Sequence, residues 1–275
     1  MSKDKAFVDT TVYTDRLLKT GVKGESARKA LNSYKHTELP VYAIKEFKAG
    51  PLKNFAWMHN TLVTTNSFWE SLAALQRMSL SPHRYITSTA LEALMEVAKE
   101  LRNLTNEDLT EKYGKSATKD AMECDMYRYA IKQRIHNSWK RRRRVTTAVV
   151  QPLSCYPETE LFENRGLIKL DPVNVKCNPT KECCLGPLLR KDVESLKKLR
   201  DTIDNLPQKA ENLSRRKALH EIIRKPKQNV SEDYCRALGD AYFALFCPDD
   251  AAILTTNTRD HEPLAKALDK EVHSP

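Results

Sequence analysis

The sequence of 275 residues contains few glycines and no long apolar run. Only 7 residues are glycine, too few for the many tight turns of an all-β fold, so a helix-rich fold is expected. The longest uninterrupted apolar segment, residues 241–247, is far shorter than the stretch of about 18 residues that crosses a membrane. The chain opens on charged residues and lacks the pattern of a signal peptide. We therefore expect no membrane partner.

Several common catalytic patterns are also missing. The sequence has no phosphate-cradling glycine loop, no dinucleotide-binding fingerprint and no Ser-His-Asp arrangement. Asp9 is not followed by a second Asp two positions later, which excludes a phosphatase of the haloacid dehalogenase type. The seven cysteines are odd in number and irregularly spaced, so we expect a reducing intracellular compartment, the cytoplasm.

Four of the cysteines fall in one irregular segment: Cys155, Cys177, Cys183 and Cys184. Four thiolates are able to hold a structural zinc ion, but no C-x-x-C pair is present and adjacent cysteines make awkward tetrahedral ligands. Buried free thiols are the favoured interpretation, with a zinc site as the alternative.

Positive charge is plentiful. Lys and Arg number 46 against 36 Asp and Glu, a formal net charge of +10, which favours a polyanionic partner although solubility alone is an alternative explanation. A basic run ends a predicted helix over residues 121–143 and consists of Lys140, Arg141, Arg142, Arg143 and Arg144. A helix end needs less positive charge than this. RNA phosphates are therefore the predicted ligand of the basic run, with a solvated helix end as the alternative.

Apolar segments alternate with helical patterns at both ends of the chain. Residues 6–8 and 251–254 are predicted buried strands, and a further short strand is predicted over residues 40–42. This alternation predicts an α/β fold with a parallel sheet flanked by helices. Residues 61–229 are mostly helical by their apolar spacing. We expect a core built from residues 1–60 and 230–275, with a large, mainly helical insertion over 61–229.

Acidic residues follow the predicted strands. Asp9 comes directly after residues 6–8, and Asn257 and Asp260 follow residues 251–254. Because ligands of an open α/β sheet lie beyond the carboxyl ends of its strands, these side chains are expected to converge. Glu46 and Asp240 are expected on helices next to the strands. A single Asp after a strand is often a simple cap or turn residue. The hypothesis of a shared site therefore depends on all of these residues together.

Converging carboxylates repel one another unless one of them has a raised pKa or a cation binds between them. Oxygen donors without a histidine cluster favour Mg²⁺ or Mn²⁺ over Zn²⁺. Such ions activate water and offset the charge of a phosphodiester displacement. His261 follows Asp260 and so lies near the expected site in sequence, but surface placement is the default expectation for it.

Four short motifs resemble, in the same order, those of PIN-domain nucleases such as the VapC-like toxins. They are AFVDTTV at residues 6–12, VYAIKEFKAG at 41–50, LGDAYFA at 238–244 and ILTTNTRDH at 253–261. The resemblance implies a PIN-like sheet and a metal-dependent site. On this chain the implied catalytic metal ligands are Asp9, Glu46, Asp240 and Asp260, with Asn257 assisting.

The function that the resemblance implies is a Mg²⁺- or Mn²⁺-dependent endoribonuclease, either a toxin or an antiviral defence effector. An inhibitory protein partner and a homodimer are compatible with it. Two features depart from the family: Glu46 and Asp240 are 194 residues apart, and Asn257 stands where an acid is usual. These departures leave two alternatives, a non-catalytic RNA-binding or partner-binding protein on a degenerate PIN scaffold, and a nuclease acting on DNA.

Overall fold

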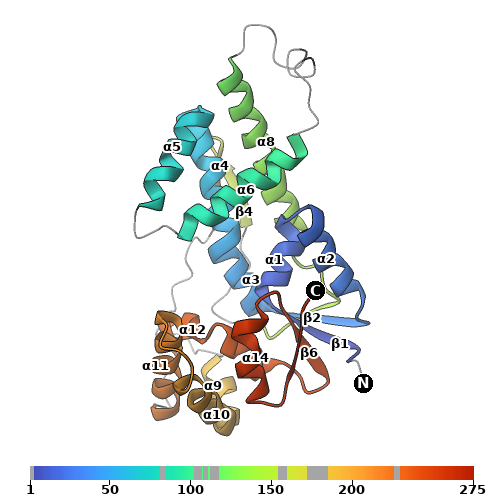
Figure 1. Ribbon diagram of the computed structural model, residues 1–275, viewed down its shortest axis with the longest axis vertical. Coiled ribbons are helices and arrows are strands. Elements are labelled where there is room, and N and C mark those ends of the chain that lie inside the picture. The colour runs from blue at the N-terminus through green and yellow to red at the C-terminus, as the bar shows by residue number, and fades with distance from the viewer. Residues whose placement is uncertain are drawn as a thin grey trace.

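The computed structural model describes residues 3–80, 85–101, 118–153, 160–171, 185–225 and 230–275, together with residues 107 and 111. In this part of the chain a parallel sheet is flanked by helices (Figure 1), which confirms the predicted α/β class. The sheet has five strands: β1 (Lys5–Val8), β2 (His36–Pro40), β3 (Ala148–Val150), β6 (Ala251–Leu254) and β7 (Glu271–His273).

The strand order is β3-β2-β1-β6-β7, and every neighbouring pair is parallel. From β1 the chain moves outward to β2 and β3, then returns to the other side of β1 to add β6 and β7. The direction of winding therefore reverses between β1 and β6. The crevice at the carboxyl ends of two such strands is where open α/β sheets bind ligands. Asp9 stands there, with its backbone N–H donating to Leu254 O at 3.0 Å.

Two helices, α1 (Thr10–Leu18) and α2 (Gly21–Asn32), connect β1 to β2. Asp9 caps α1, because its carboxylate accepts a hydrogen bond from Thr11 N. A side chain at Gly24 would bring a Cβ to 2.3 Å from the carbonyl oxygen of Lys19. Glycine at this position therefore lets α2 pack closely against the end of α1.

The connection from β2 to β3 carries a large group of helices: α3 (Val41–Phe47), the π-helical turn η1 (Lys48–Leu52), α4 (Lys53–Thr65), α5 (Phe68–Ser79), α6 (Tyr85–Leu101) and α8 (Lys119–Arg141). In Figure 1, α4, α5, α6 and α8 gather at one end of an elongated molecule. Buried apolar side chains such as Leu62 of α4 and Ile131 of α8 hold this group together.

The second strand differs from the prediction of residues 40–42. Strand β2 ends at Pro40, and Val41 and Tyr42 already belong to α3. Proline has no N–H to continue the strand ladder, but its φ of −68° suits the residue that precedes a helix. Strand β3 lies inside the range 61–229 yet pairs with β2, so the sheet also draws on the middle of the chain.

The connection from β3 to β6 begins with the hairpin of β4 (Glu160–Asn164) and β5 (Leu167–Asp171), which packs on α4. It continues with α9 (Leu185–Leu189), the short turn η2 (Arg190–Asp192), α10 (Val193–Asp204), α11 (Ala210–Arg224), α12 (Glu232–Leu238) and α13 (Asp240–Phe246). Helix α14 (Thr258–Lys266) then joins β6 to β7. Helices α9 to α12 form the other end of the molecule in Figure 1.

An aromatic cluster in the core fixes the helices that carry the predicted acids. Tyr42 of α3 stacks on Tyr242 of α13 with ring centroids 4.1 Å apart, and Phe243 meets Phe7 of β1 edge-on at 6.0 Å. All four rings are buried, and loss of a ring of this kind costs about 3–5 kcal/mol. Glu46 lies one helical turn after Tyr42, and Asp240 lies just before Tyr242. The cluster therefore holds both acids near the end of β1.

In the described residues, Cys124, Cys235 and Cys247 are buried cysteines that form no disulfide. The predicted cluster of Cys155, Cys177, Cys183 and Cys184 lies outside the described residues. The helices that the structure describes include none with the length and apolar character needed to cross a membrane.

Candidate functional site

Asp9 is a buried carboxylate at the carboxyl end of β1, with 3% of its surface exposed. Its Oδ2 accepts hydrogen bonds from Thr11 Oγ1 at 2.6 Å and from Thr255 Oγ1 at 2.8 Å. Burial acts to raise the pKa of Asp9, but His261 and the two threonines outweigh it and hold the pKa below its ordinary value. Among the described residues all hydrogen bonds to this carboxylate use Oδ2, which leaves Oδ1 available to another partner.

The two threonines join the ends of β1 and β6. Thr255 is fully buried directly after β6, and its Oγ1 accepts a hydrogen bond from Asn257 N at 2.9 Å. Thr11 Oγ1 accepts one from Thr256 N at 3.1 Å. Because each hydroxyl also donates to Asp9, the start of α1 and the start of α14 are held around one carboxylate.

Glu46 reaches the same place from α3. Its Oε2 accepts a hydrogen bond from Thr10 Oγ1 at 2.5 Å. Burial raises the pKa of Glu46 to about 7, against the effect of the Thr10 hydrogen bond, and the nearby charges of Asp9 and Asp240 raise it further. Glu46 therefore changes protonation state near neutral pH, and its pKa reflects the presence of both other acids.

Asp240 opens α13, and both of its carboxylate oxygens face cations. Oδ2 lies 2.8 Å from Arg215 Nη2, and Oδ1 lies 3.2 Å from His261 Nε2. Gly239, which precedes it, has a φ of +43°, and a Cβ there would lie 3.2 Å from Arg215 Nη2. Glycine is therefore favoured at this position both by the backbone conformation and by the approach of the Arg215 side chain.

His261 lies between two of the acids, which corrects its expected surface placement. The side chain is 1% exposed, and Nε2 stands 3.5 Å from Asp9 Oδ2 as well as 3.2 Å from Asp240 Oδ1. As the side chains stand, neither contact meets the geometry of a hydrogen bond, and both are ion pairs when the imidazole is protonated. Burial opposes that charge, but the two acids outweigh it and raise the pKa of His261 to about 9.

Asp260 and Asn257 do not reach the centre of this cluster in the same way. Both lie at the start of α14, where Asn257 Nδ2 donates to Asp260 Oδ2 at 3.1 Å. Both side chains are partly exposed. The structure therefore brings together Asp9, Glu46 and Asp240, and it leaves Asp260 paired with Asn257 beside them.

The donor set of this site suits a hard divalent cation. Asp9, Glu46 and Asp240 offer carboxylate oxygens, the ligands that Mg²⁺ and Mn²⁺ prefer. As the side chains stand, however, no three His, Cys, Asp or Glu residues in the described part of the chain are arranged to hold a metal ion. His261 and Arg215 supply the positive charge that balances the acids. Metal binding here would require carboxylate rotation away from these two cations.

The basic run lies beside the helix that Asp9 caps. Lys140 and Arg141 end α8, and the other three residues follow the helix. Tyr13 of α1 donates its hydroxyl to the Arg142 carbonyl oxygen at 2.6 Å, and the Arg142 guanidinium lies 4.1 Å from the Trp139 ring centroid. The run is thus fixed against α1, with four of its five side chains exposed.

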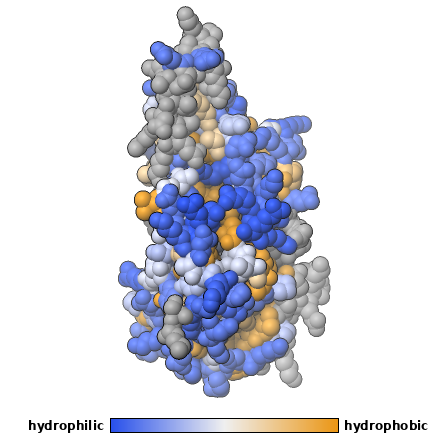
Figure 2. All heavy atoms as spheres, turned by 90° about the vertical axis from the view of Figure 1, so that its right-hand side faces the viewer, coloured by the Kyte–Doolittle hydropathy of each residue, from blue (hydrophilic) through white to orange (hydrophobic). Residues whose placement is uncertain are grey.

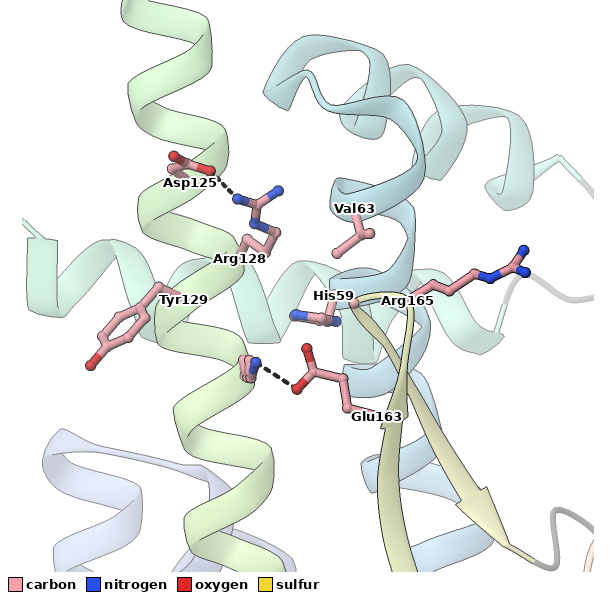
Figure 3. A pocket seen from close by; sticks show the side chains of 9 residues that line it. His59, Val63, Asp125, Arg128, Tyr129, Glu163 and Arg165 are labelled. Atoms are coloured by element: carbon pink, nitrogen blue, oxygen red, sulfur yellow. Dashed lines mark hydrogen bonds and ion pairs between the residues drawn. The ribbon is translucent and has the colours of Figure 1, made fainter. Parts of the chain in front are cut away.

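A separate cavity of about 820 Å³ lies between α4, α8 and the β4–β5 hairpin. Figure 3 shows His59 and Val63 on α4 and the ion pair of Arg128 and Asp125 on α8. Lys132 Nζ of α8 lies 2.6 Å from Glu163 Oε2 of β4. None of the residues predicted from the sequence to bind metal or RNA lines this cavity. Its central charges are already paired, so we assign no ligand to it.

Comparison with known proteins gave no match to a family model, to a curated protein or to a solved structure. A functional assignment therefore depends on the geometry of the acidic site and on the motif resemblance.

Proposed function

We propose that this protein is a metal-dependent endoribonuclease with a PIN-like core. One observation carries the proposal: Asp9, Glu46 and Asp240 converge at the switch point of the sheet from three segments far apart in the sequence. Helix capping alone accounts for Asp9, but it does not account for Glu46 and Asp240 close by. The pKa values of Asp9 and Glu46 are both shifted, and carboxylates of this kind in such a crevice are typical of a catalytic site.

Asp9, Glu46 and Asp240 would hold Mg²⁺ or Mn²⁺, with Asp260 and Asn257 completing the ligand set from α14. The bound ion would supply an activated water and offset the negative charge of the phosphodiester. With a pKa of about 7, Glu46 is able to accept or release a proton at neutral pH. The basic run would contact RNA phosphates next to the site.

The biological role that the motif resemblance supports is a toxin or an antiviral effector, restrained by an inhibitory protein partner. The resemblance alone supports this part of the proposal.

A second candidate function is favoured by the two cations in the site. Arg215 and His261 already neutralise Asp240, as expected of a degenerate scaffold that binds RNA or a protein without catalysis. This candidate predicts RNA binding without cleavage under any metal condition.

The two candidates separate in a cleavage assay with purified protein, labelled single-stranded RNA and a single-stranded DNA of the same sequence. We expect RNA to be cut when Mn²⁺ is present and to remain intact in EDTA, with the DNA spared. RNA that is bound and never cut would favour the second candidate. Cutting that persists in EDTA would remove the metal from the proposal, and preferential cutting of the DNA would change the substrate.

A further inference from the structure

Three arginines from three different helices share one surface. Arg16 belongs to α1, Arg28 to α2 and Arg141 to the end of α8; we call them the arginine cluster. Helix α1 packs against both α2 and α8, which places Arg28 and Arg141 on the helices next to Arg16. The positive charges of Arg141 and Arg28 lower the pKa of Arg16 beyond the effect of burial, as expected if each of them lies near Arg16. Figure 2 shows the face of the molecule on which α2 lies. Strongly hydrophilic residues gather across the middle of this face, at the same height as α1 and α2 in Figure 1.

The end of α8 is held rigidly in this position. Arg134 Nη1 donates to the Leu18 carbonyl oxygen at 3.0 Å, which ties α8 to the end of α1. About two helical turns further along α8, the Tyr13 hydroxyl donates a hydrogen bond to the Arg142 carbonyl oxygen. The arginine cluster is therefore built on packed helices and not on a loose chain end.

No ion pair within the described part of the chain neutralises the charge of the cluster. Among the described residues, Arg16, Arg28 and Arg141 form no ion pair, whereas basic residues earlier in α8 do. Arg128 pairs with Asp125, as Figure 3 shows, and Lys132 pairs with Glu163. The dipole of α8 favours positive charge at its end, but it gives no reason for arginines of α1 and α2 to join it. Mutually repelling guanidinium groups are stabilised by an anion.

The cluster lies close to the acidic site. Helix α1 begins directly after Asp9, and Arg16 follows two turns later, about 10 Å along the helix axis. A polymer held at the acidic site can therefore reach the cluster within a few residues of its own length.

We propose that the arginine cluster binds consecutive backbone phosphates of single-stranded RNA and leads the strand to the acidic site. The identity of the polymer rests on the proposed function. The planar guanidinium fork suits phosphate oxygens. A single strand is favoured over a duplex because Asp9 is nearly inaccessible, at 3% exposure, and only a flexible strand brings a phosphate into such a crevice.

The test is RNA binding measured by fluorescence anisotropy in EDTA, so that no cutting occurs. The cluster variant carries Arg16→Ala, Arg28→Ala and Arg141→Ala. The matched control carries Lys197→Ala, Arg200→Ala and Arg224→Ala on α10 and α11, with the same change in charge. We expect the Kd of the cluster variant to rise about tenfold or more and the slope of log Kd against log salt to fall by about 2, since each phosphate contact to a single strand contributes about 0.7.

Arg16 is partly buried, so its replacement could disturb folding. A second variant therefore leaves Arg16 unchanged. Arg28→Glu with Arg141→Glu changes only exposed side chains and is expected to weaken binding at least as strongly. Unchanged affinity in this variant, equal loss in the matched control, or cluster-dependent preference for duplex RNA or anionic vesicles would each overturn the proposal.

The two proposals fail separately. Cluster-dependent RNA binding by a protein that never cuts RNA would refute the nuclease alone. RNA cleavage by the parent protein, together with unchanged binding by both cluster variants, would refute the arginine cluster alone.

Discussion

Replacement of Asp9 or Asp240 by Asn is expected to reduce Mn²⁺-dependent RNA cleavage by roughly 100-fold or more, because even residues that only support a metal ligand typically contribute 10–100-fold. Each substitution removes one negative charge from the cluster around His261. Asn also caps helices well, so the Asp9→Asn protein is expected to keep α1 intact. The measurement is the initial rate of cleavage of a labelled single-stranded RNA.

The matched control for this experiment is Asp249→Asn. Asp249 precedes β6, at the opposite end of the sheet, and its exposed carboxylate pairs with Lys270. The control is expected to cut at the parental rate. Asp260→Asn is expected to fall between these cases, because Asp260 contacts Asn257 and not the central acids. If Asp9→Asn and Asp240→Asn both cut as fast as the parent, the site is assigned to the wrong residues.

The metal-free protein is expected to lose about 3 kcal/mol of its free energy of unfolding as the pH rises from 6.5 to above 9, through His261 alone. The pKa of His261 is raised from 6.5 to about 9 in the folded protein. Its protonated form is therefore favoured by folding. The stabilisation is fully present below pH 6.5 and is lost as the pH rises through the folded pKa.

Urea unfolding in EDTA at about pH 6.5 and about pH 9.5 measures this loss, with His261→Gln as the comparison. The variant is expected to show a correspondingly smaller change, since its residue 261 does not titrate. Glu46 contributes in the same direction, because its pKa is raised from 4.5 to about 7, and it is present in both proteins. Identical pH dependence in parent and variant would mean that His261 is not held as a cation between the two acids.

Much of the site follows from the sequence because it is built from strand ends. Asp9 directly follows an apolar run that has room only for a buried strand, and parallel strands bring their carboxyl ends to one edge. Asp240 borders the most apolar segment of the chain, so its helix had to pack in the core. The proximity in space of residues from the two ends of the chain could therefore be predicted without any knowledge of the helices between them.

The cations of the site could not be predicted in the same way. Arg215 reaches Asp240 from α11, and nothing in the local pattern of either residue indicates that contact. His261 did have a signal: together with Leu264 and Ala265 it forms the buried face of α14 at helical spacing. Strand β3 is only three residues long, too short for a recognisable alternation.

The most direct test of the central claim is Mn²⁺ binding measured by titration calorimetry. The parent and the Asp249→Asn control are expected to bind Mn²⁺, with affinity that rises from about pH 6 to about pH 8 as Glu46, with its pKa of about 7, loses its proton. Asp9→Asn and Asp240→Asn are expected to lose this binding. A parent protein that takes up no Mn²⁺, or an Asp9→Asn variant that retains the parental affinity, would contradict the assignment of a metal site to Asp9, Glu46 and Asp240.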